Sequence, residues 1–270
     1  MRFRPGQITN DPNVPKINPL FEFITLLIWL SLILAVIYYA AGVSVDYFAG
    51  LIPRELENKI GAHYKTAFKQ SADSASAGEL SALTHALAKT NGDSSAYNVI
   101  LVDSPDINAL AAPGNNIIVF SGLLKKVKSE NELAFILSHE LGHFHNRDHL
   151  KGLGRGLILL VLSSAVLGSD NPVSSAALNS VTGVEMKFSR DQERAADLFA
   201  VDLINSYYGH AAGAEEIIGS FKGIEKKPGI YYYFSTHPSP DERAGLIKAH
   251  IERKAYKTGA VKKLKKALRL

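Results

Sequence analysis

A run of 22 residues near the N-terminus constrains this chain more than any other feature. Residues 20–41 read LFEFITLLIWLSLILAVIYYAA, and Glu22 is their only charged side chain. As a helix, this run is about 33 Å long, enough to cross a hydrocarbon core of roughly 30 Å. It is apolar on all sides, unlike the surface helix of a soluble domain. We expect residues 19–42 to form a transmembrane anchor in contact with membrane lipid.

A cleaved signal peptide is the alternative interpretation of this run. Its apolar region would be shorter, and no small-x-small cleavage site follows Ala41. Arg2, Arg4 and Lys16 precede the run, whereas the charges just after it nearly balance. By the positive-inside rule, the short N-terminus stays in the cytoplasm and the rest of the chain lies outside it.

The positive charge of the chain is concentrated at its C-terminal end. Residues 253–270 contain eight Lys or Arg and no acidic residue. These eight positive charges exceed the formal net charge of the whole chain, which is +4. The basic character therefore belongs to a tail, and we expect no nucleic-acid partner. Leu264 and Leu268 would share one side of a basic amphipathic helix over 262–270, suited to a membrane surface; a solvated tail is the alternative. The absence of cysteine excludes disulfides, thiolate metal sites and a cysteine nucleophile.

Local patterns organise the rest of the chain. Residues 1–18 are polar and predict a disordered tail, and residues 43–252 are long enough for one folded domain. Apolar spacing and turn residues predict helices over 54–70 and 78–89 and strands over 97–102 and 116–120. Ser129 and Glu132 form a capping-box pattern that predicts a helix start. The apolar run 157–167 is short for a membrane span, so we expect a core or interfacial helix there.

The stretch 134–149, AFILSHELGHFHNRDH, contains four histidines, and its apolar spacing is helical. On a helix, His139 and His143 share one face and can bind the same metal ion. Glu140 beside them can take a proton from a metal-bound water. This HExxH pattern predicts a catalytic zinc site rather than a chance match.

A catalytic zinc ion takes three protein ligands, and the spacing leaves the third one open. His149 lies ten residues after His139, as in the pattern HExxHxxGxxH, although Asn146 replaces the glycine. Glu193 and Asp197 are four apart on a predicted helix and would repel each other with nothing between them. A metal ion on Glu193 and the outer nitrogen of a ligand histidine on Asp197 would remove that repulsion.

The later segment 235–243, STHPSPDER, adds two donors. Pro238 favours an extended backbone at His237, and Arg243 follows near a predicted helix start. Beside a zinc ion, either side chain can stabilise the oxyanion of a tetrahedral intermediate.

Four motifs in this order resemble peptidase family M48, the Ste24- and HtpX-like zinc metallopeptidases. They are INALAAPGNNIIVFSGLL, SHELGHFHNRDH, RDQERAAD and HPSPDER, and the resemblance extends from about Glu55 to Ala249. It implies an α+β, predominantly helical, zincin-like domain of the gluzincin type with a small sheet, preceded by one transmembrane helix. It also implies one zinc ion per chain, bound by His139, His143 and Glu193.

The resemblance implies roles for the remaining candidates as well. Glu140 becomes the general base, and Asp197 supports a metal ligand. His237 and Arg243 belong to the active-site surround, whereas His149 becomes a structural residue.

The family also pairs an extended substrate with a strand beside the zinc helix. The implied counterpart is the strand of Asn116, Ile117, Ile118, Val119 and Phe120. We expect this strand to lie at a sheet edge, because unpaired N–H and C=O groups let a peptide add itself as a further strand.

Multi-span members of the family carry several membrane helices, whereas this chain has a single clear span. It is therefore similar to single-anchor bacterial members, with the peptidase domain outside the cytoplasm at the inner membrane. We expect an endopeptidase that cleaves extended polypeptide segments in membrane or envelope protein quality control. The alternative is a membrane-anchored chaperone or assembly factor with a latent or structural zinc site.

Overall fold

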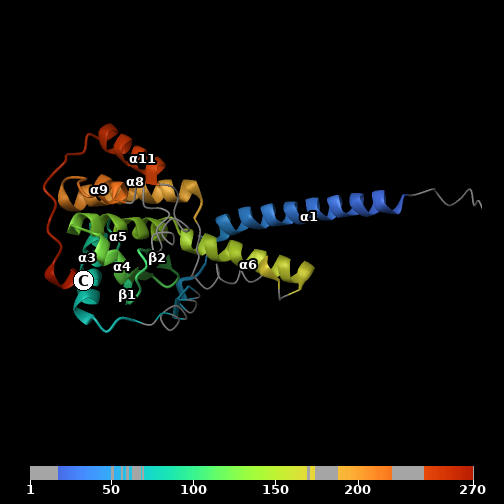
Figure 1. Cartoon of the computed structure of the whole chain (residues 1–270), viewed down its shortest axis with the longest axis horizontal. Coiled ribbons are helices and arrows are strands. Elements are labelled where there is room, and N and C mark those ends of the chain that lie inside the picture. Colours follow the sequence, from blue (N-terminus) through green and yellow to red (C-terminus); the bar gives the residue numbers. More distant parts are fainter. Residues whose placement is uncertain are drawn as a thin grey trace, which may run out of the picture. The chain divides into compact units, whose positions relative to one another are not determined.

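Figure 1 shows the computed structural model of the chain. The structure describes residues 18–49, 52–55, 57–58, 61–62, 68, 70–168, 171–173, 188–220 and 240–269. The chain divides into two compact units, Met1–Ala41 and Gly42–Leu270. The expected disordered tail, apart from residue 18, lies outside the described residues, and so does His237.

The first unit holds most of helix α1 (Pro19–Phe48). The Asn18 side chain accepts a hydrogen bond from the backbone N–H of Leu20 at 3.0 Å, as a helix N-cap does. Mean hydropathy reaches 2.6 along Pro19–Val45, and most of its large apolar side chains are exposed. Among the described residues, α1 is the one helix long and apolar enough to cross a bilayer. An N-terminal signal sequence has the same properties.

The second unit is mostly helical and contains a small sheet, which confirms the expected fold class. The sheet consists of β1 (Asn98–Val102), β2 (Ala109–Ala112) and β3 (Asn116–Phe120), in the order β1-β3-β2. β1 runs parallel to β3, and β2 runs antiparallel to it. Strands β1 and β3 were predicted, but β2 was missed because its sequence, ALAA, lacks the branched and aromatic residues typical of strands.

The hairpin between β2 and β3 depends on a left-handed turn. Gly114 has φ 76° and Asn115 has φ 56°, and glycine and asparagine occupy this region at the lowest cost. The Asn116 amide closes the hairpin by donating to the carbonyls of Pro113 (2.6 Å) and Gly61 (3.0 Å). Asn116 is fully buried. It therefore supports the loop and is not exposed to a substrate, contrary to the expectation.

The position of β3 also differs from the expectation. β3 is the central strand, and both of its sides are paired, residues 116–120 with β1 and residues 116–119 with β2. The prediction that β3 is an edge strand with unpaired backbone groups is therefore wrong. The edge strand that packs against the helix carrying His139 and His143 is β2.

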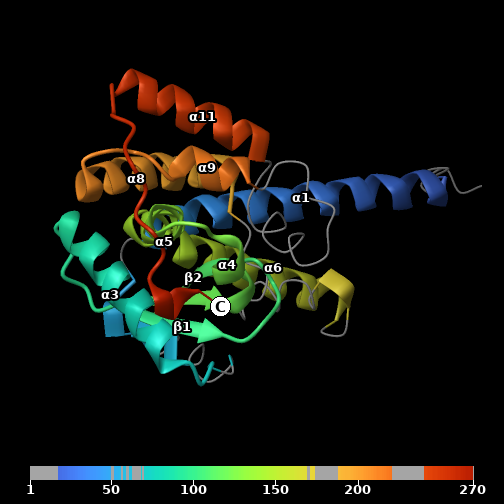
Figure 2. The ribbon, with the colours of Figure 1, turned by 60° about the vertical axis from the view of Figure 1, so that its left-hand side comes forward.

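Helices make up most of the rest of the described second unit (Figure 2). They are α3 (Ser74–Thr90), α4 (Ser121–Lys126), α5 (Glu130–His145), α6 (Asp148–Leu167), α8 (Arg190–Tyr208), α9 (Ala214–Gly219), α11 (Pro240–Arg253) and the 3-10 helix η2 (Lys266–Leu268). The predicted helices over 78–89 and from Ser129 are confirmed, and the apolar run 157–167 forms the second half of α6.

Helix α5 lies at the centre of the unit, between the sheet and α3 on one side and α8 on the other. The Ser129 hydroxyl accepts from the Glu132 N–H at 3.1 Å, which begins the helix as predicted. Residues Glu130–Phe144 are all buried. Gly142 allows α8 to approach closely, because a Cβ atom there would lie 3.0 Å from the Ala196 Cα. This contact places polar side chains of α5 and α8 together in a dry interior.

The basic tail differs from the expected amphipathic helix. Residues 256–265 contain no helix. Leu264 and Leu268 are 5% and 1% exposed, and both belong to the main hydrophobic core. The Lys262 N–H donates to the Asn131 side chain at 2.8 Å, which ties the tail to the first turn of α5. These leucines therefore stabilise the domain and are not available to a membrane surface.

We expect Leu268→Ala to lower the free energy of unfolding by about 2–5 kcal/mol, the usual cost of truncating a buried leucine. Val261→Ala is the matched control, because Val261 is 45% exposed; its effect should stay within about 0.5 kcal/mol. Urea unfolding of the full chain in detergent micelles measures both. Equal, small effects would show that the tail is solvated.

Candidate metal centre

Helices α5 and α8 bring two imidazoles and one carboxylate together. The Nε2 atoms of His139 and His143 lie 3.2 Å apart. The Glu193 Oε2 lies 3.5 Å from the His139 Nε2, and its Oε1 lies 3.4 Å from the His143 Nε2. All three side chains are at most 2% exposed. The structure therefore brings together the two HExxH histidines and Glu193, the third ligand that the resemblance implies.

The chemistry of these donors fits a metal ion. One donor atom from each of the three residues lies within 4.8 Å of the other two. Both Nδ1 atoms face a carboxylate, Asp197 at 2.9 Å and Asp148 at 3.2 Å. Since each Nδ1 faces a carboxylate, both Nε2 atoms are left facing the carboxylate of Glu193. Only a positive charge at the centre stabilises such an arrangement.

The carboxylates around the centre also raise the pKa of His143. Burial disfavours the charged ring, but hydrogen bonds to Asp148 and Glu193 and the charges of Glu193 and Glu140 outweigh it and raise the pKa to about 10. The pKa of His139 is also raised: the charge of Glu193 and hydrogen bonds to Asp197 and Glu193 outweigh its burial. The cluster thus attracts positive charge, and a metal ion has to displace protons to bind.

Asp197 lies one turn after Glu193 on α8 and contacts His139, as expected. Arg243 of α11 donates to it twice, from Nε at 2.9 Å and from Nη2 at 2.6 Å. Burial raises the pKa of Asp197, but Arg243 and His139 outweigh this effect and lower it to about 2. We expected either His237 or Arg243 to stabilise the oxyanion, and the guanidinium of Arg243 is bound to Asp197.

Asp148 is a member of the site that sequence reasoning missed. Its Oδ2 lies 3.2 Å from the Nδ1 of His143, and it is 1% exposed. Phe188 stacks on the other side of His143, with ring centroids 3.8 Å apart and planes at 15°. No pattern marks these two residues, because Asp148 follows a break in the helix and Phe188 precedes α8.

Glu140 occupies the same buried region of α5 and is 1% exposed. Within the part of the chain that the structure describes, its Oε2 atom has no hydrogen-bond partner. A buried carboxylate oxygen without a partner is costly, and such atoms are concentrated at functional sites. An orphaned oxygen on Glu140, whose charge acts on the ligand His143, fits a water molecule on a metal ion.

The other two histidines of the stretch have different partners. His149 is 2% exposed, and its Nε2 lies 2.9 Å from the Oε1 of Glu57. His145 stacks on Phe199 at 5.0 Å between centroids. The spacing of His149 made it a candidate third ligand, but in the structure its side chain contacts Glu57 instead.

We expect Arg243→Gln to lower the free energy of unfolding at pH 7 by about 3 kcal/mol, because Asp197 would lose the partner of its buried charge. The pKa of Asp197 is lowered from 3.8 to about 2. Its contribution is therefore complete above pH 4 and is lost as the pH falls toward 2, so the difference between variant and parent should shrink over that range.

Urea unfolding of the metal-free full chain in detergent at pH 7, 5 and 3 measures this difference. Arg194→Gln on the exposed face of α8 is the control, with a change within about 0.5 kcal/mol. A loss for Arg243→Gln that did not depend on pH would contradict the assigned role of the ion pair.

Comparison with known proteins agrees with this geometry. Residues 74–251, more than half of the chain, match the model of peptidase family M48. The mitochondrial metalloendopeptidase OMA1 of Arabidopsis thaliana is 29% identical over 151 residues, which cover 56% of this chain and 31% of the relative. The metalloprotease YcaL of Escherichia coli is 29% identical over 168 residues, or 60% of this chain and 64% of the relative.

A beta-barrel assembly-enhancing protease of Yersinia pestis is 25% identical over 174 residues, which cover 58% of this chain and 35% of the relative. The chain thus spans less than two thirds of the length of each of these relatives. The matched region includes both histidines of the HExxH pattern, Glu140 and Glu193. The chain belongs to peptidase family M48.

Proposed function

We propose that this chain is a membrane-anchored zinc endopeptidase that cleaves extended polypeptide segments. His139, His143 and Glu193 would hold one zinc ion, because two imidazoles and one carboxylate are a typical catalytic zinc set. When bound, zinc supplies a Lewis acid that polarises the scissile carbonyl and makes water nucleophilic near neutral pH. The observation that carries the proposal is the buried Oε2 of Glu140, which follows the ligand His139 in sequence and has no hydrogen-bond partner in the described part of the chain.

Glu140 is the general base in this proposal. Its free oxygen accepts a proton from the attacking water and passes it to the leaving amine of the peptide. The burial of Glu140 and of the three donors excludes bulk water, which strengthens electrostatic interactions with the developing charge.

Asp197 and Arg243 have a supporting role. Asp197 keeps the proton of His139 on Nδ1, and Arg243 keeps Asp197 ionised. His237 remains the candidate for stabilising the oxyanion, since the guanidinium of Arg243 is bound to Asp197.

The substrate would pair with the outer edge of β2 instead of with β3. β2 is an edge strand, runs antiparallel to its neighbour and packs against α5. In the described part of the chain, no other strand is paired with that outer edge. Ala109, Leu110, Ala111 and Ala112 are at most 3% exposed, so the edge has to be uncovered before a peptide can add to it.

The proposed location is a bacterial inner membrane, crossed once by α1, with the protease domain outside the cytoplasm. The length and hydropathy of α1 support the anchor. A relative named as a beta-barrel assembly-enhancing protease supports a role in envelope protein quality control.

A membrane-anchored chaperone or assembly factor with a latent zinc site is the second candidate. The observation that favours it is the burial of the site, since the three donors and Glu140 are at most 2% exposed. Zinc content measured together with cleavage of casein separates the two. Zinc without cleavage under every condition tried would support the chaperone.

We expect Glu140→Gln to keep zinc and the fold but to lose cleavage by about 10²–10⁴-fold, the usual contribution of a general base. Metal analysis and hydrolysis of a quenched fluorescent peptide measure the two properties separately. The matched control is Glu215→Gln on the exposed side of α9, which should cleave at the parent rate. Full activity in Glu140→Gln would remove Glu140 from the mechanism.

The topology predicts how intact spheroplasts respond to an added protease. A tag at the C-terminus should be digested without lysis, because the domain lies outside the cytoplasm. A cytoplasmic reporter protein, which should stay intact until lysis, controls for leakage. Protection of the tag would place the domain in the cytoplasm and would change the class of available substrates.

A further inference from the structure

Each ligand imidazole of the metal centre has its own carboxylate, Asp197 for His139 and Asp148 for His143. We propose that Asp148 is a positioning residue that orients His143 for the metal, and that Glu57, which follows the apolar helix in sequence, holds Asp148 in place. This inference rests on the proposed zinc site.

The first step is the break between α5 and α6. Asp148 is five residues after His143, and on a continuous helix the two side chains would be about 140° apart. The chain breaks at Arg147, which takes the left-handed conformation (φ 54°, ψ 30°). Because of this break, α6 begins at Asp148, and the carboxylate of Asp148 contacts the ring of His143.

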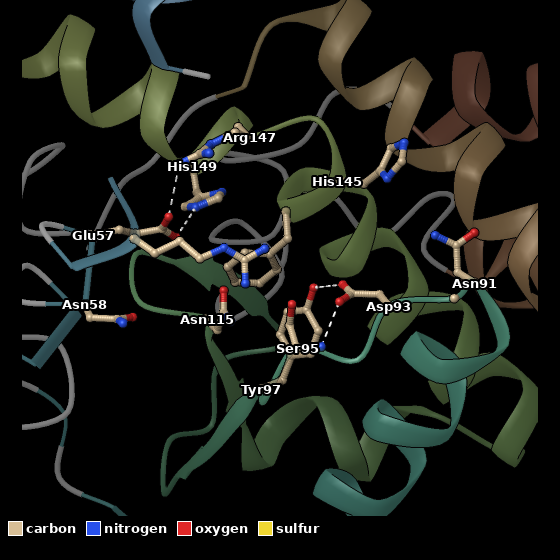
Figure 3. A pocket seen from close by; sticks show the side chains of 13 residues that line it. Glu57, Asn58, Asn91, Asp93, Ser95, Tyr97, Asn115, His145, Arg147 and His149 are labelled. Carbon is tan, nitrogen blue, oxygen red and sulfur yellow. Dashed lines mark hydrogen bonds and ion pairs between the residues drawn. The ribbon is translucent and has the colours of Figure 1, made fainter. Parts of the chain in front are cut away.

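The second step is what holds this break in place. A non-glycine residue is strained in the left-handed region, so the surrounding contacts have to stabilise it. Arg147 donates from Nη2 to the carbonyl of Ile52 at 3.1 Å and to the Oε2 of Glu57 at 3.2 Å. His149 faces the Oε1 of Glu57 at 2.9 Å. In Figure 3 the carboxylate of Glu57 contacts both residues that flank Asp148 in sequence.

Glu57 is suited to this bridging position. It is 7% exposed and forms one wall of a cavity of about 410 Å³ that also involves Arg147 and His149. Burial raises the pKa of Glu57, but the hydrogen bond and charge of His149 and the charge of Arg147 outweigh it and leave the pKa lowered. The carboxylate is thus charged at neutral pH and binds both flanking side chains at once.

The third step is the orientation of Asp148 itself. Its Oδ1 accepts from the Nζ of Lys151 at 3.1 Å and from the Nε2 of Gln192 at 3.0 Å. Gln192 precedes the ligand Glu193 on α8. These two donors occupy one oxygen and leave Oδ2 for His143, so Asp148 links α5, α6 and α8 at the metal centre.

The test compares zinc affinity between variants of the full chain in detergent, by competition with a fluorescent chelator. We expect Asp148→Ala to weaken zinc binding by about 10–100-fold, the range typical of carboxylates that orient a ligand histidine. Asp148→Asn, which keeps an acceptor oxygen, should lose less. Glu57→Gln should also weaken zinc binding although it is outside the ligand set. Asp103→Asn, an exposed aspartate with no part in this network, should bind zinc like the parent.

A second readout separates orientation of His143 from a general loss of stability. The absorption bands of bound cobalt report ligand geometry, and we expect them to change in Asp148→Ala and to stay unchanged in Asp103→Asn. The inference would be overturned if metal-free Asp148→Ala were less stable to heat than the parent but bound zinc with parental affinity and gave the parental cobalt spectrum. If Asp148→Ala does not fold, Asp148→Asn and Glu57→Gln decide by the same criteria.

The failures of the two proposals are distinguishable. A parent chain that binds no zinc would contradict the proposed function. A parent that binds zinc and cleaves peptide, with Asp148→Asn and Asp148→Ala at parental affinity, would contradict only the role of Asp148. Parental affinity in Glu57→Gln alone would contradict the role of Glu57.

Discussion

The close packing of α5 against α8 is the contact on which the site depends. A Cβ at Gly142 would lie 3.0 Å from the Ala196 Cα, tighter than ordinary contact, so the two helices would have to shift. With glycine there, Glu193 reaches both ligand histidines from the opposite helix. A site of this type needs its donors fixed within a fraction of an ångström, and rigid helices provide that precision better than loops.

The same packing brings several negative charges together in the interior of the domain. Four carboxylates gather in or around the cluster: Glu140, Asp148, Glu193 and Asp197. Arg243 and Lys151 partly neutralise them. The remaining negative charge in a dry interior raises the pKa of both ligand histidines and favours a divalent cation. The buried acids and the metal ion therefore require each other, which explains why so many charged groups are tolerated in the core.

Residues close in sequence on one regular element were predicted well. The HExxH pair, the helix start at Ser129 and the apolar α1 follow from helical periodicity and capping. Features that depend on partners far along the chain were missed. β2 lacks strand-forming residues and is held by its pairing with β3. Leu264 and Leu268 suggested a surface helix, because their burial depends on contacts with distant parts of the core. Asp148 has no periodic relation to His143, because Arg147 breaks the helix.

The amino-acid sequence by itself determined the apolar helix, the two imidazoles on one face of α5 and the adjacent Glu140, because each is a matter of local spacing. Spacing alone favoured Glu193 only slightly over His149 as the third ligand. The tertiary structure decided between them by packing α8 on α5 and by binding His149 to Glu57. It also decided that β3 is central and that Arg243 binds Asp197. These outcomes depend on the contacts that buried surfaces and charges make with segments far along the chain. The free energy of those contacts does not follow from local spacing, because it arises only in the folded structure.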